Sequence, residues 1–165
     1  QLTSEYLRRN EAVDFTVKHD DGLGLETLSE ANIILLGISR TSKTPISIYL
    51  AFRGFKVANI PIVKGVPIPA KVWEVETRKL VGLTIAPQTL LELRKNRLEK
   101  MGKRFAESYA TLESIREEAT YARRLFSELG DVPLIDVTGK AIEEAATEVL
   151  LILTTPRRAA DSPGE

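Results

Sequence analysis

The stretch Gly37-Ile38-Ser39-Arg40-Thr41-Ser42-Lys43-Thr44 decides the fold of this chain, because it has the pattern of a phosphate-binding loop. The general pattern is a Gly, four residues, a second Gly, a Lys and then a Ser or Thr. Its backbone N–H groups cradle phosphates, its Lys reaches the outer phosphates and its hydroxyl binds Mg²⁺. Ser42 replaces the second Gly, and its side chain either needs a tolerable backbone angle or costs some strain. We expect Gly37 to Thr44 to hold phosphates, with Lys43 as a catalytic residue and Thr44 as the metal ligand.

The sequence on either side of this loop supports the interpretation. The wholly apolar run Ile33–Leu36 before it is typical of a buried strand. After it, Pro45 suits the first turn of a helix, and Ile46, Tyr49 and Leu50 follow at helical spacing. The N-terminus of this helix would face the phosphates.

Strands and helices alternate along the rest of the chain, which predicts an α/β fold with a mainly parallel sheet flanked by helices, arranged like a P-loop nucleotide kinase. Period-two alternation of Val13, Phe15 and Val17 predicts an edge strand. The expected strands are Val13–Lys18, Asn32–Leu36, Lys56–Val63, Leu80–Ile85 and Val132–Val137. The expected helices are Thr3–Asn10, the segment from the loop to Gly54, Pro87–Met101, Tyr109–Leu129 and Ile142–Leu150.

Composition limits the classes of function. The chain has 165 residues, 43% of them hydrophobic, which is enough for one core, so we expect a single domain over 1–153 and a disordered tail over 154–165. The 23 basic and 23 acidic residues cancel, which argues against a nucleic-acid or membrane-surface partner. The absence of cysteine excludes thiol chemistry and permits a cytoplasmic location, and the single His excludes a His-rich metal site.

The phosphate loop and several collinear segments together resemble the pyruvate, phosphate dikinase regulatory proteins, a family of bifunctional kinase/phosphorylases. Full members have a substantial N-terminal region, so this chain resembles their C-terminal catalytic part. The Thr41-Ser42 pair resembles the dikinase branch, because regulators of phosphoenolpyruvate synthase more often have Gly before the Lys. The matching segments are Lys18–Gly22, Gly37–Ala51, Lys56–Val63, Gly82–Ile85, Arg94–Arg97 and Ile135–Glu144.

The resemblance implies a protein serine/threonine kinase that uses ADP to phosphorylate an active-site threonine of pyruvate, phosphate dikinase. It also implies a phosphorylase that uses inorganic phosphate to remove the modification and yields pyrophosphate. ADP and Mg²⁺ are the expected nucleotide and metal, and a homo-oligomer is compatible with the sequence. Three other functions stay open: a regulator of phosphoenolpyruvate synthase, a kinase for a small molecule, and a nucleotide switch without chemistry.

The turn His19-Asp20-Asp21-Gly22 contains the candidate catalytic carboxylates. Spacing alone favours a solvated turn. The alternative is that Asp20 or Asp21 lies beside the nucleotide, where it binds Mg²⁺ through water or accepts a proton from a hydroxyl nucleophile. The resemblance, which includes this turn, favours the functional interpretation. His19 is interpreted as a turn residue.

A basic segment between Arg94 and Arg104 gives a second candidate set of phosphate ligands. Arg94 and Arg97 are three residues apart on a face that overlaps Leu90 and Leu93, so they do not simply face solvent. They either close over phosphates as a lid or form part of a solvated charged surface. Both interpretations stay open.

Two further predictions concern residues outside the loop. Trp73 is expected to anchor packing over the core. Asp136, Thr138 and Lys140 lie at the end of the last expected strand and could reach the base or ribose, but capping of the next helix by Thr138 is favoured.

Overall fold

The computed structural model describes residues 3–101 and 111–155. Their sheet has four strands, all parallel, in the order β2-β1-β3-β4. The predicted α/β class is therefore confirmed. The strands are β1 (Ile33–Gly37), β2 (Val57–Pro61), β3 (Leu80–Thr84) and β4 (Leu134–Asp136).

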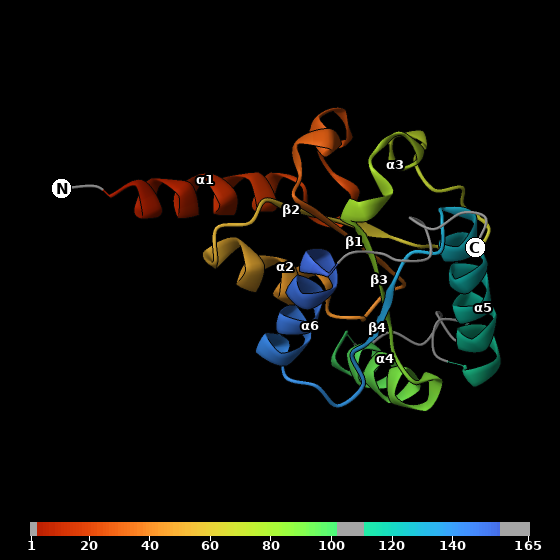
Figure 1. The fold of residues 1–165 in the computed structure, drawn as a ribbon. Helices are drawn as coiled ribbons and strands as arrows, with labels where there is room; N and C mark the ends of the chain where they lie inside the picture. Colours follow the sequence, from red (N-terminus) through yellow and green to blue (C-terminus); the bar gives the residue numbers. More distant parts are fainter. Residues whose placement is uncertain (1–2, 102–110, 156–165) are drawn as a thin grey trace.

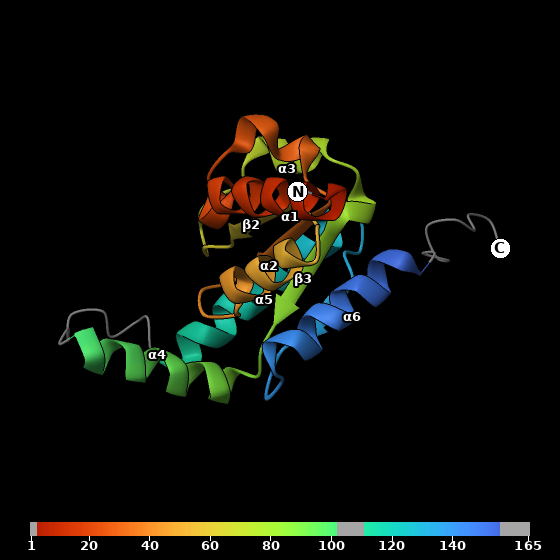
Figure 2. The same ribbon diagram turned by 90° about the vertical axis from the view of Figure 1, so that its left-hand side faces the viewer.

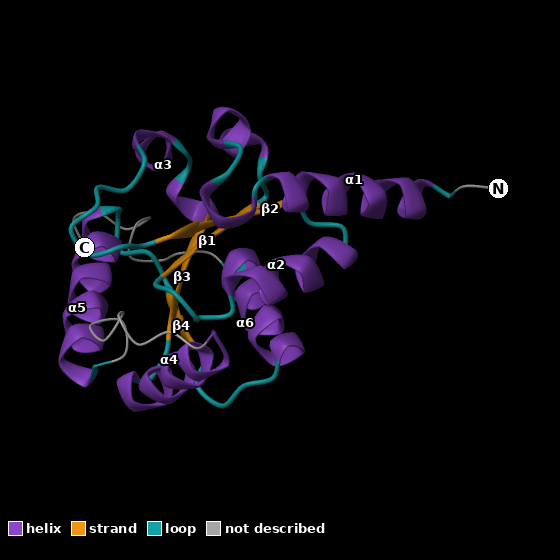
Figure 3. Cartoon of the chain, turned by 180° about the vertical axis from the view of Figure 1, so that it is seen from behind, coloured by secondary structure: helices purple, strands orange, loops and turns teal. Residues whose placement is uncertain are grey.

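Helices cover both faces of this sheet, which gives three layers (Figure 1). Figure 2 looks onto the layer that contains α2 and α6, and Figure 3 shows the same arrangement from behind. On one face, α2 and α6 pack over a cluster that includes Ile33, Leu35 and Val81. On the other, α5 and part of α4 pack over a cluster that includes Ile34 and Leu36. The helices are α1 (Ser4–Lys18), α2 (Lys43–Phe52), α3 (Ala70–Glu74), α4 (Pro87–Met101), α5 (Leu112–Glu128) and α6 (Ile142–Thr154), with short 3-10 turns η1 (Asp20–Gly22), η2 (Leu25–Glu30) and η3 (Thr77–Lys79).

Strand β1 alternates its side chains between the two clusters, which explains why Ile33–Gly37 is buried throughout. Pro61 ends β2, and β2 lies at the edge of the sheet, as predicted for a residue without a backbone N–H. Gly54 follows the end of α2 with φ +95°, and its N–H donates to Ala51 O at 2.9 Å, which confirms the predicted helix stop.

The predicted edge strand Val13–Lys18 is wrong, because these residues belong to α1. The buried residues of α1 are Ala12, Phe15 and Thr16, a helical spacing that the alternation of Val13, Phe15 and Val17 hid. Thr16 Oγ1 accepts a hydrogen bond from Val57 N at 3.0 Å, which joins α1 to the edge strand β2. Packing of this face on the sheet edge and on α2 therefore favours the helix.

The Trp73 prediction is also wrong in its detail. Trp73 is 50% exposed, and its neighbour Val72 is the residue of α3 that is buried in the core. The predicted disordered tail falls largely on residues 156–165, outside the described residues, but Thr154 still belongs to α6. Within the described ranges, none of the helices combines the length and apolar character that crossing a membrane requires.

Candidate functional site

The predicted phosphate loop lies between the carboxyl end of β1 and the N-terminus of α2. The carbonyl of Ile38 accepts two hydrogen bonds inside the loop, from Thr41 Oγ1 at 2.8 Å and from Lys43 Nζ at 3.0 Å. A Cβ at Gly37 would lie 2.6 Å from Thr41 Oγ1 and 3.2 Å from the carbonyl oxygen of Leu83, so only Gly fits there. Hydrogen bonds to the Ile38 carbonyl thus hold the loop in a compact conformation.

Two residues of the loop have left-handed backbone conformations. Arg40 has φ +71° and Ser42 has φ +66°, so Ser42 adopts the conformation for which the general motif uses Gly. A non-Gly residue in this region costs about 1 to 2 kcal/mol. Such strain concentrates where a fixed backbone geometry serves a ligand.

Lys43 is the buried cation of the site, with 8% of its surface exposed. Burial lowers the pKa of Lys43 from 10.5 to about 8, and the nearby guanidinium groups of Arg94 and Arg40 act in the same direction. The carboxylates of Asp21 and Asp20 oppose this shift. A phosphate dianion at this point would supply the negative charge that a buried ammonium lacks.

The acidic turn lies directly against the loop. Thr44 Oγ1 donates a hydrogen bond to Asp20 Oδ1 at 2.8 Å. Asn59 of β2 donates from Nδ2 to the same oxygen at 2.6 Å and accepts from Asp21 N at 2.9 Å. Asp21 is exposed and has φ +51°, a left-handed conformation that the bond to Asn59 holds. The structure therefore brings Asp20, Asp21 and Thr44 together.

His19 supports this turn through buried contacts. It is buried, its ring stacks on Phe15, Nδ1 lies 2.7 Å from Phe15 O, and Nε2 lies 2.6 Å from Thr27 Oγ1. Its own carbonyl accepts a hydrogen bond from Asn59 N at 3.2 Å. His19 is thus a structural residue of the turn, as the sequence indicates.

The donor set at Asp20 and Thr44 fits Mg²⁺. Magnesium prefers oxygen ligands and is usually held by one or two carboxylates together with substrate phosphates and water. A carboxylate and a hydroxyl 2.8 Å apart beside a phosphate loop match that preference. In the described part of the chain there is no group of three or more His, Cys, Asp or Glu side chains for a metal held by protein ligands alone.

A cavity of about 600 Å³ connects these groups. Its lining includes Leu93 and Arg97 of α4, Pro61 at the end of β2 and Val63 beyond it. A second cavity of about 390 Å³ shares Ser39, Pro61 and Val63 with it, so the space extends along the surface toward α5. The residues that line the first cavity are Asp20, Asp21, Ser39, Arg40, Thr41, Ser42, Lys43, Thr44, Pro45, Pro61, Val63, Leu93 and Arg97.

The two candidate arginines of α4 differ in position. Arg97 is exposed on the cavity wall, where a guanidinium can reach phosphate oxygens. Arg94 has no exposed surface and is absent from the described lining of the cavity. It forms an ion pair with Glu118 and donates to Ser39 O at 3.2 Å, so it contacts the loop rather than the cavity.

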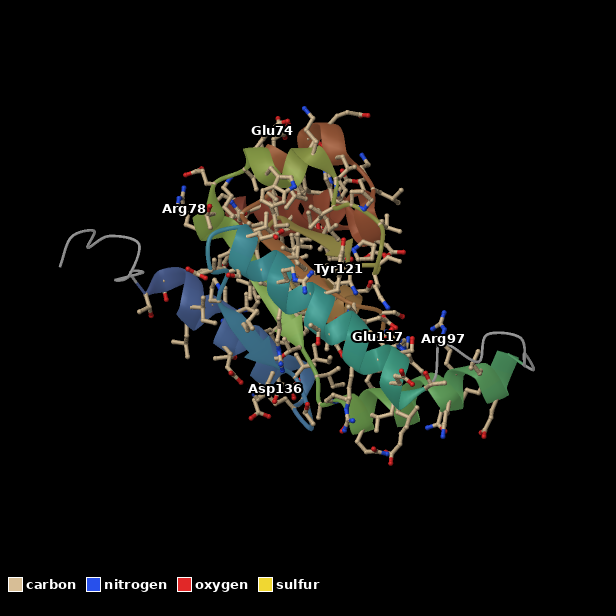
Figure 4. All side chains as sticks on the ribbon, turned by 90° about the vertical axis from the view of Figure 1, so that its right-hand side faces the viewer. Glu74, Arg78, Arg97, Glu117, Tyr121 and Asp136 are labelled. Carbon is tan, nitrogen blue, oxygen red and sulfur yellow. The ribbon has the colours of Figure 1, made fainter. Side chains whose placement is uncertain are left out.

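The polar residues at the end of β4 are absent from the lining of the cavity, and Figure 4 shows Asp136 well separated from Arg97. Asp136 Oδ1 accepts from Thr138 N at 2.9 Å and from Thr138 Oγ1 at 2.6 Å. Thr138 Oγ1 in turn accepts from Ala86 N at 2.7 Å, which ties the end of β4 to the segment after β3. Thr138 does not cap α6, which begins after Ala141, so that prediction is wrong.

Sequence reasoning missed Asn59, Ser47 and Glu118. Asn59 and Ser47 are buried, and Asn59 Nδ2 lies 3.3 Å from Ser47 Oγ. A signal was present, because Asn59 interrupts an apolar strand, and a buried polar side chain requires partners. Glu118 gave no local signal, since it is one of several charged residues of an amphipathic helix and meets Arg94 only in the folded chain.

Comparison with known proteins identifies the family that this chain resembles. A family model described as Kinase/pyrophosphorylase matches residues 1–150. A relative from Geobacter metallireducens, whose assigned name is pyruvate, phosphate dikinase regulatory protein, is 49% identical over 91% of this chain and 56% of its own length. A relative of the same name from Erythrobacter litoralis is 47% identical over 100% of this chain and 59% of its own. A chloroplastic one from Oryza sativa subsp. indica is 49% identical over 92% of this chain and 32% of its own. The chain thus spans somewhat more than half the length of these bacterial relatives.

Proposed function

Because this chain belongs to the kinase/pyrophosphorylase family, we propose that it regulates pyruvate, phosphate dikinase through reversible phosphorylation of a threonine. The kinase reaction uses ADP, and removal of the phosphoryl group from the threonine uses inorganic phosphate. The observation that carries the proposal is that Lys43, Thr44 and both carboxylates of the acidic turn meet in one cavity at a phosphate loop. The names of the relatives supply the target protein.

In the kinase direction, the threonine oxygen attacks the β-phosphorus of ADP. The bond from this phosphorus to the oxygen bridging to the α-phosphate breaks, and AMP leaves. The hydroxyl proton passes to a carboxylate, for which Asp21 is the better placed, since no hydrogen bond engages its side chain among the described contacts. Lys43 and the N–H groups of the loop and of the first turn of α2 stabilise the charge on the transferred group.

In the phosphorylase direction, an oxygen of inorganic phosphate attacks the phosphorus of phosphothreonine. The bond to the threonine oxygen breaks, this oxygen regains a proton, and pyrophosphate forms. Both directions transfer one phosphoryl group, so one set of phosphate ligands serves both. In this direction a protonated Asp21 donates the proton to the leaving threonine oxygen.

Mg²⁺ would be held by the Asp20 carboxylate and the Thr44 hydroxyl together with phosphate oxygens and water. When bound, the ion neutralises phosphate charge. Asp20 is suited to this task because Thr44 and Asn59 already orient its Oδ1. Arg97 adds a guanidinium at the cavity wall.

A protein substrate must bring its threonine to the outer phosphate, which requires an accessible cleft. The exposed residues Arg40, Val63 and Arg97 at the cavity, and the adjoining cavity beyond Ser39, support such access. A closed chamber of the size of a metabolite would instead favour a small-molecule kinase.

The test is incubation of the chain with purified pyruvate, phosphate dikinase and, separately, with phosphoenolpyruvate synthase. Each mixture receives ADP or ATP, and mass spectrometry follows threonine phosphorylation. A parallel assay uses a chain extended to the length of the relatives, and Lys43→Ala is the control. We expect ADP-dependent labelling of the dikinase, and its loss on addition of inorganic phosphate with formation of pyrophosphate. Labelling of the synthase alone would identify the sister regulator, and labelling of neither protein by the extended chain would overturn the proposal.

A further inference from the structure

Arg94 is the largest fully buried side chain among the described residues, and none of its surface is exposed. Transfer of a guanidinium from water to a protein interior costs several kcal/mol unless close partners compensate. The contacts of Arg94 therefore indicate what it does.

Those contacts join three separate elements. Arg94 of α4 donates from Nη1 to Glu118 Oε2 of α5 at 2.7 Å and from Nη2 to Glu118 Oε1 at 2.9 Å, a two-point ion pair. Nη2 also donates to the carbonyl of Ser39 in the phosphate loop at 3.2 Å. Glu118 has 17% of its side chain exposed, so the pair is shielded from water. The planar guanidinium is thus fixed at two points by Glu118 and presents a third donor to the loop.

The position of this contact in the loop matters. In a trans peptide unit the C=O and the following N–H point in opposite directions. Because the carbonyl of Ser39 faces the buried Arg94, the N–H of Arg40 points away from Arg94, and both Ser39 and Arg40 line the cavity. Arg40 is also one of the two strained residues of the loop, with φ +71°. An external contact is therefore available to hold this peptide unit in a conformation that the chain alone disfavours.

Helix α5, which carries Glu118, also contacts a second loop near the cavity, the segment that follows β2. Glu117, next to Glu118, pairs with Lys64 beyond β2, and Tyr121 Oη donates to Val66 O at 3.0 Å. Figure 4 shows Glu117 and Tyr121 on one side of α5. Helix α5 thus contacts both loops that border the site, although no residue of α5 is among the described residues that line the first cavity.

We propose that Arg94 and Glu118 form a positioning pair, which fixes the Ser39–Arg40 peptide so that its N–H can donate a hydrogen bond to a phosphate oxygen. The pair acts through the loop and makes no contact with the nucleotide. Its effect on ADP rests on the proposed function, whereas its effect on the loop does not.

The first experiment separates this positioning role from a contribution to folding. In Glu118→Gln and Arg94→Met, one partner of a buried pair is lost, so both stability and ADP affinity should fall, the affinity by about tenfold. In the double variant Arg94→Met/Glu118→Met, two apolar side chains replace the pair, so stability should largely recover. ADP affinity should not recover, because no donor reaches Ser39 O. Isothermal titration with ADP and urea denaturation give the two quantities, and a stable double variant with wild-type ADP affinity would overturn the proposal.

The second experiment requires no nucleotide. Residual dipolar couplings measured by NMR report the orientation of the Arg40 N–H bond. We expect this coupling to change in the double variant and to stay constant in Glu148→Gln, a control that breaks the partly exposed Lys140–Glu148 pair of α6. An unchanged Arg40 orientation in the double variant would overturn the proposal. If the wild-type chain fails to bind ADP while the Arg40 coupling changes as expected, the proposed function fails and the positioning pair stands.

Discussion

Three of the four non-Gly residues with positive φ in the described chain lie at the candidate site: Asp21, Arg40 and Ser42. Each has an external support or a neighbouring constraint: Asn59 holds Asp21, Arg94 contacts the peptide before Arg40, and Ser42 precedes α2. For Asp21 and Arg40 the strain is thus held by contacts that lie at the candidate cavity. At the scale of single residues, the site thus contains strained backbone conformations that fix the directions of its N–H groups.

Replacement of Ser42 by Gly tests this strain. Gly adopts φ +66° without a steric penalty, but it also gains entropy in the unfolded chain. Because the two effects oppose each other, we expect the free energy of unfolding of Ser42→Gly to stay within about 1 kcal/mol of wild type. ADP affinity should be retained. Ser42→Val is the matched comparison and should be less stable by more than 1 kcal/mol or so, since a β-branched residue disfavours this region; equal stability of the two variants by urea denaturation would contradict the argument.

The lowered pKa of Lys43 predicts a dependence of stability on pH. With a folded-state pKa of about 8 and an ordinary value of 10.5, the ammonium is charged in both states below pH 8, so the burial penalty is then complete. Between these values the unfolded chain binds the proton that the folded chain has released, so the free energy of unfolding rises with pH. Lys43→Met should therefore be more stable than wild type below pH 8, by up to about 3 kcal/mol.

Urea denaturation of both proteins from pH 7 to 10 measures that difference. It should shrink steadily between pH 8 and 10.5, because neutral Lys43 no longer carries the burial penalty. The comparison of two proteins at each pH removes the titration of other groups. A difference that stays constant with pH would mean that the burial of Lys43 does not oppose its charge.

The two carboxylates of the turn should differ in their kinetic roles. Asp21→Asn removes the proposed proton acceptor and should lower kcat by about 10² to 10⁴ with little effect on ADP affinity. It also removes a charge that raises the pKa of Lys43, so the assay is made at pH 7, below that pKa. Asp20→Asn should weaken ADP binding in the presence of Mg²⁺ while leaving metal-free binding nearly unchanged. Steady-state kinetics and titrations with and without Mg²⁺ decide, and equal effects of the two variants would remove the distinction.

At the scale of the elements, the phosphate loop and its strand and helix could be predicted because their signals are local. An apolar strand, a motif with fixed spacing and a helix-starting Pro45 all lie within one short stretch. Helix α1 could not be predicted over its full length, because Val13, Phe15 and Val17 also fit a strand, and only packing of Phe15 and Thr16 on β2 and α2 decides between the two. The same limit applies to the site, where Asn59 and Glu118 function through residues far away in sequence.

Contact between β3 and α5 gives a prediction at this scale. A Cβ on Gly82 would lie 2.7 Å from Leu134 Cδ2 and 2.8 Å from Phe126 Cζ, so Gly82 lets α5 approach the sheet closely. Gly82→Ala should lower the free energy of unfolding by about 1 to 3 kcal/mol through overpacking. Chemical denaturation measures this loss. An unchanged midpoint would mean that α5 moves away from β3 without penalty.

At the scale of the whole molecule, the candidate site and the packed core lie in different regions. The chain has 23 basic and 23 acidic residues, so attraction of a phosphate depends on the local groups of the loop rather than on net charge. The cavity lies at the carboxyl edge of β1 and β2, whereas Gly82 and Phe126 lie in the packed layer between β3 and α5. Ligand binding and core packing should therefore contribute independently to stability.

Thermal unfolding with ADP tests this independence. At a ligand concentration 100 times its Kd, binding stabilises the folded state by about 2.7 kcal/mol, which raises the Tm of a chain of this size by roughly 5 to 10 °C. Gly82→Ala should unfold at a lower temperature without ADP and gain the same increment with it, because its defect lies away from the loop. Lys43→Ala should fold but gain nothing, because the cation that meets the phosphates is gone. An equal ADP-dependent increase in Lys43→Ala would place the nucleotide outside the phosphate loop, and a reduced increase in Gly82→Ala would show that the packing of α5 extends its influence to the site.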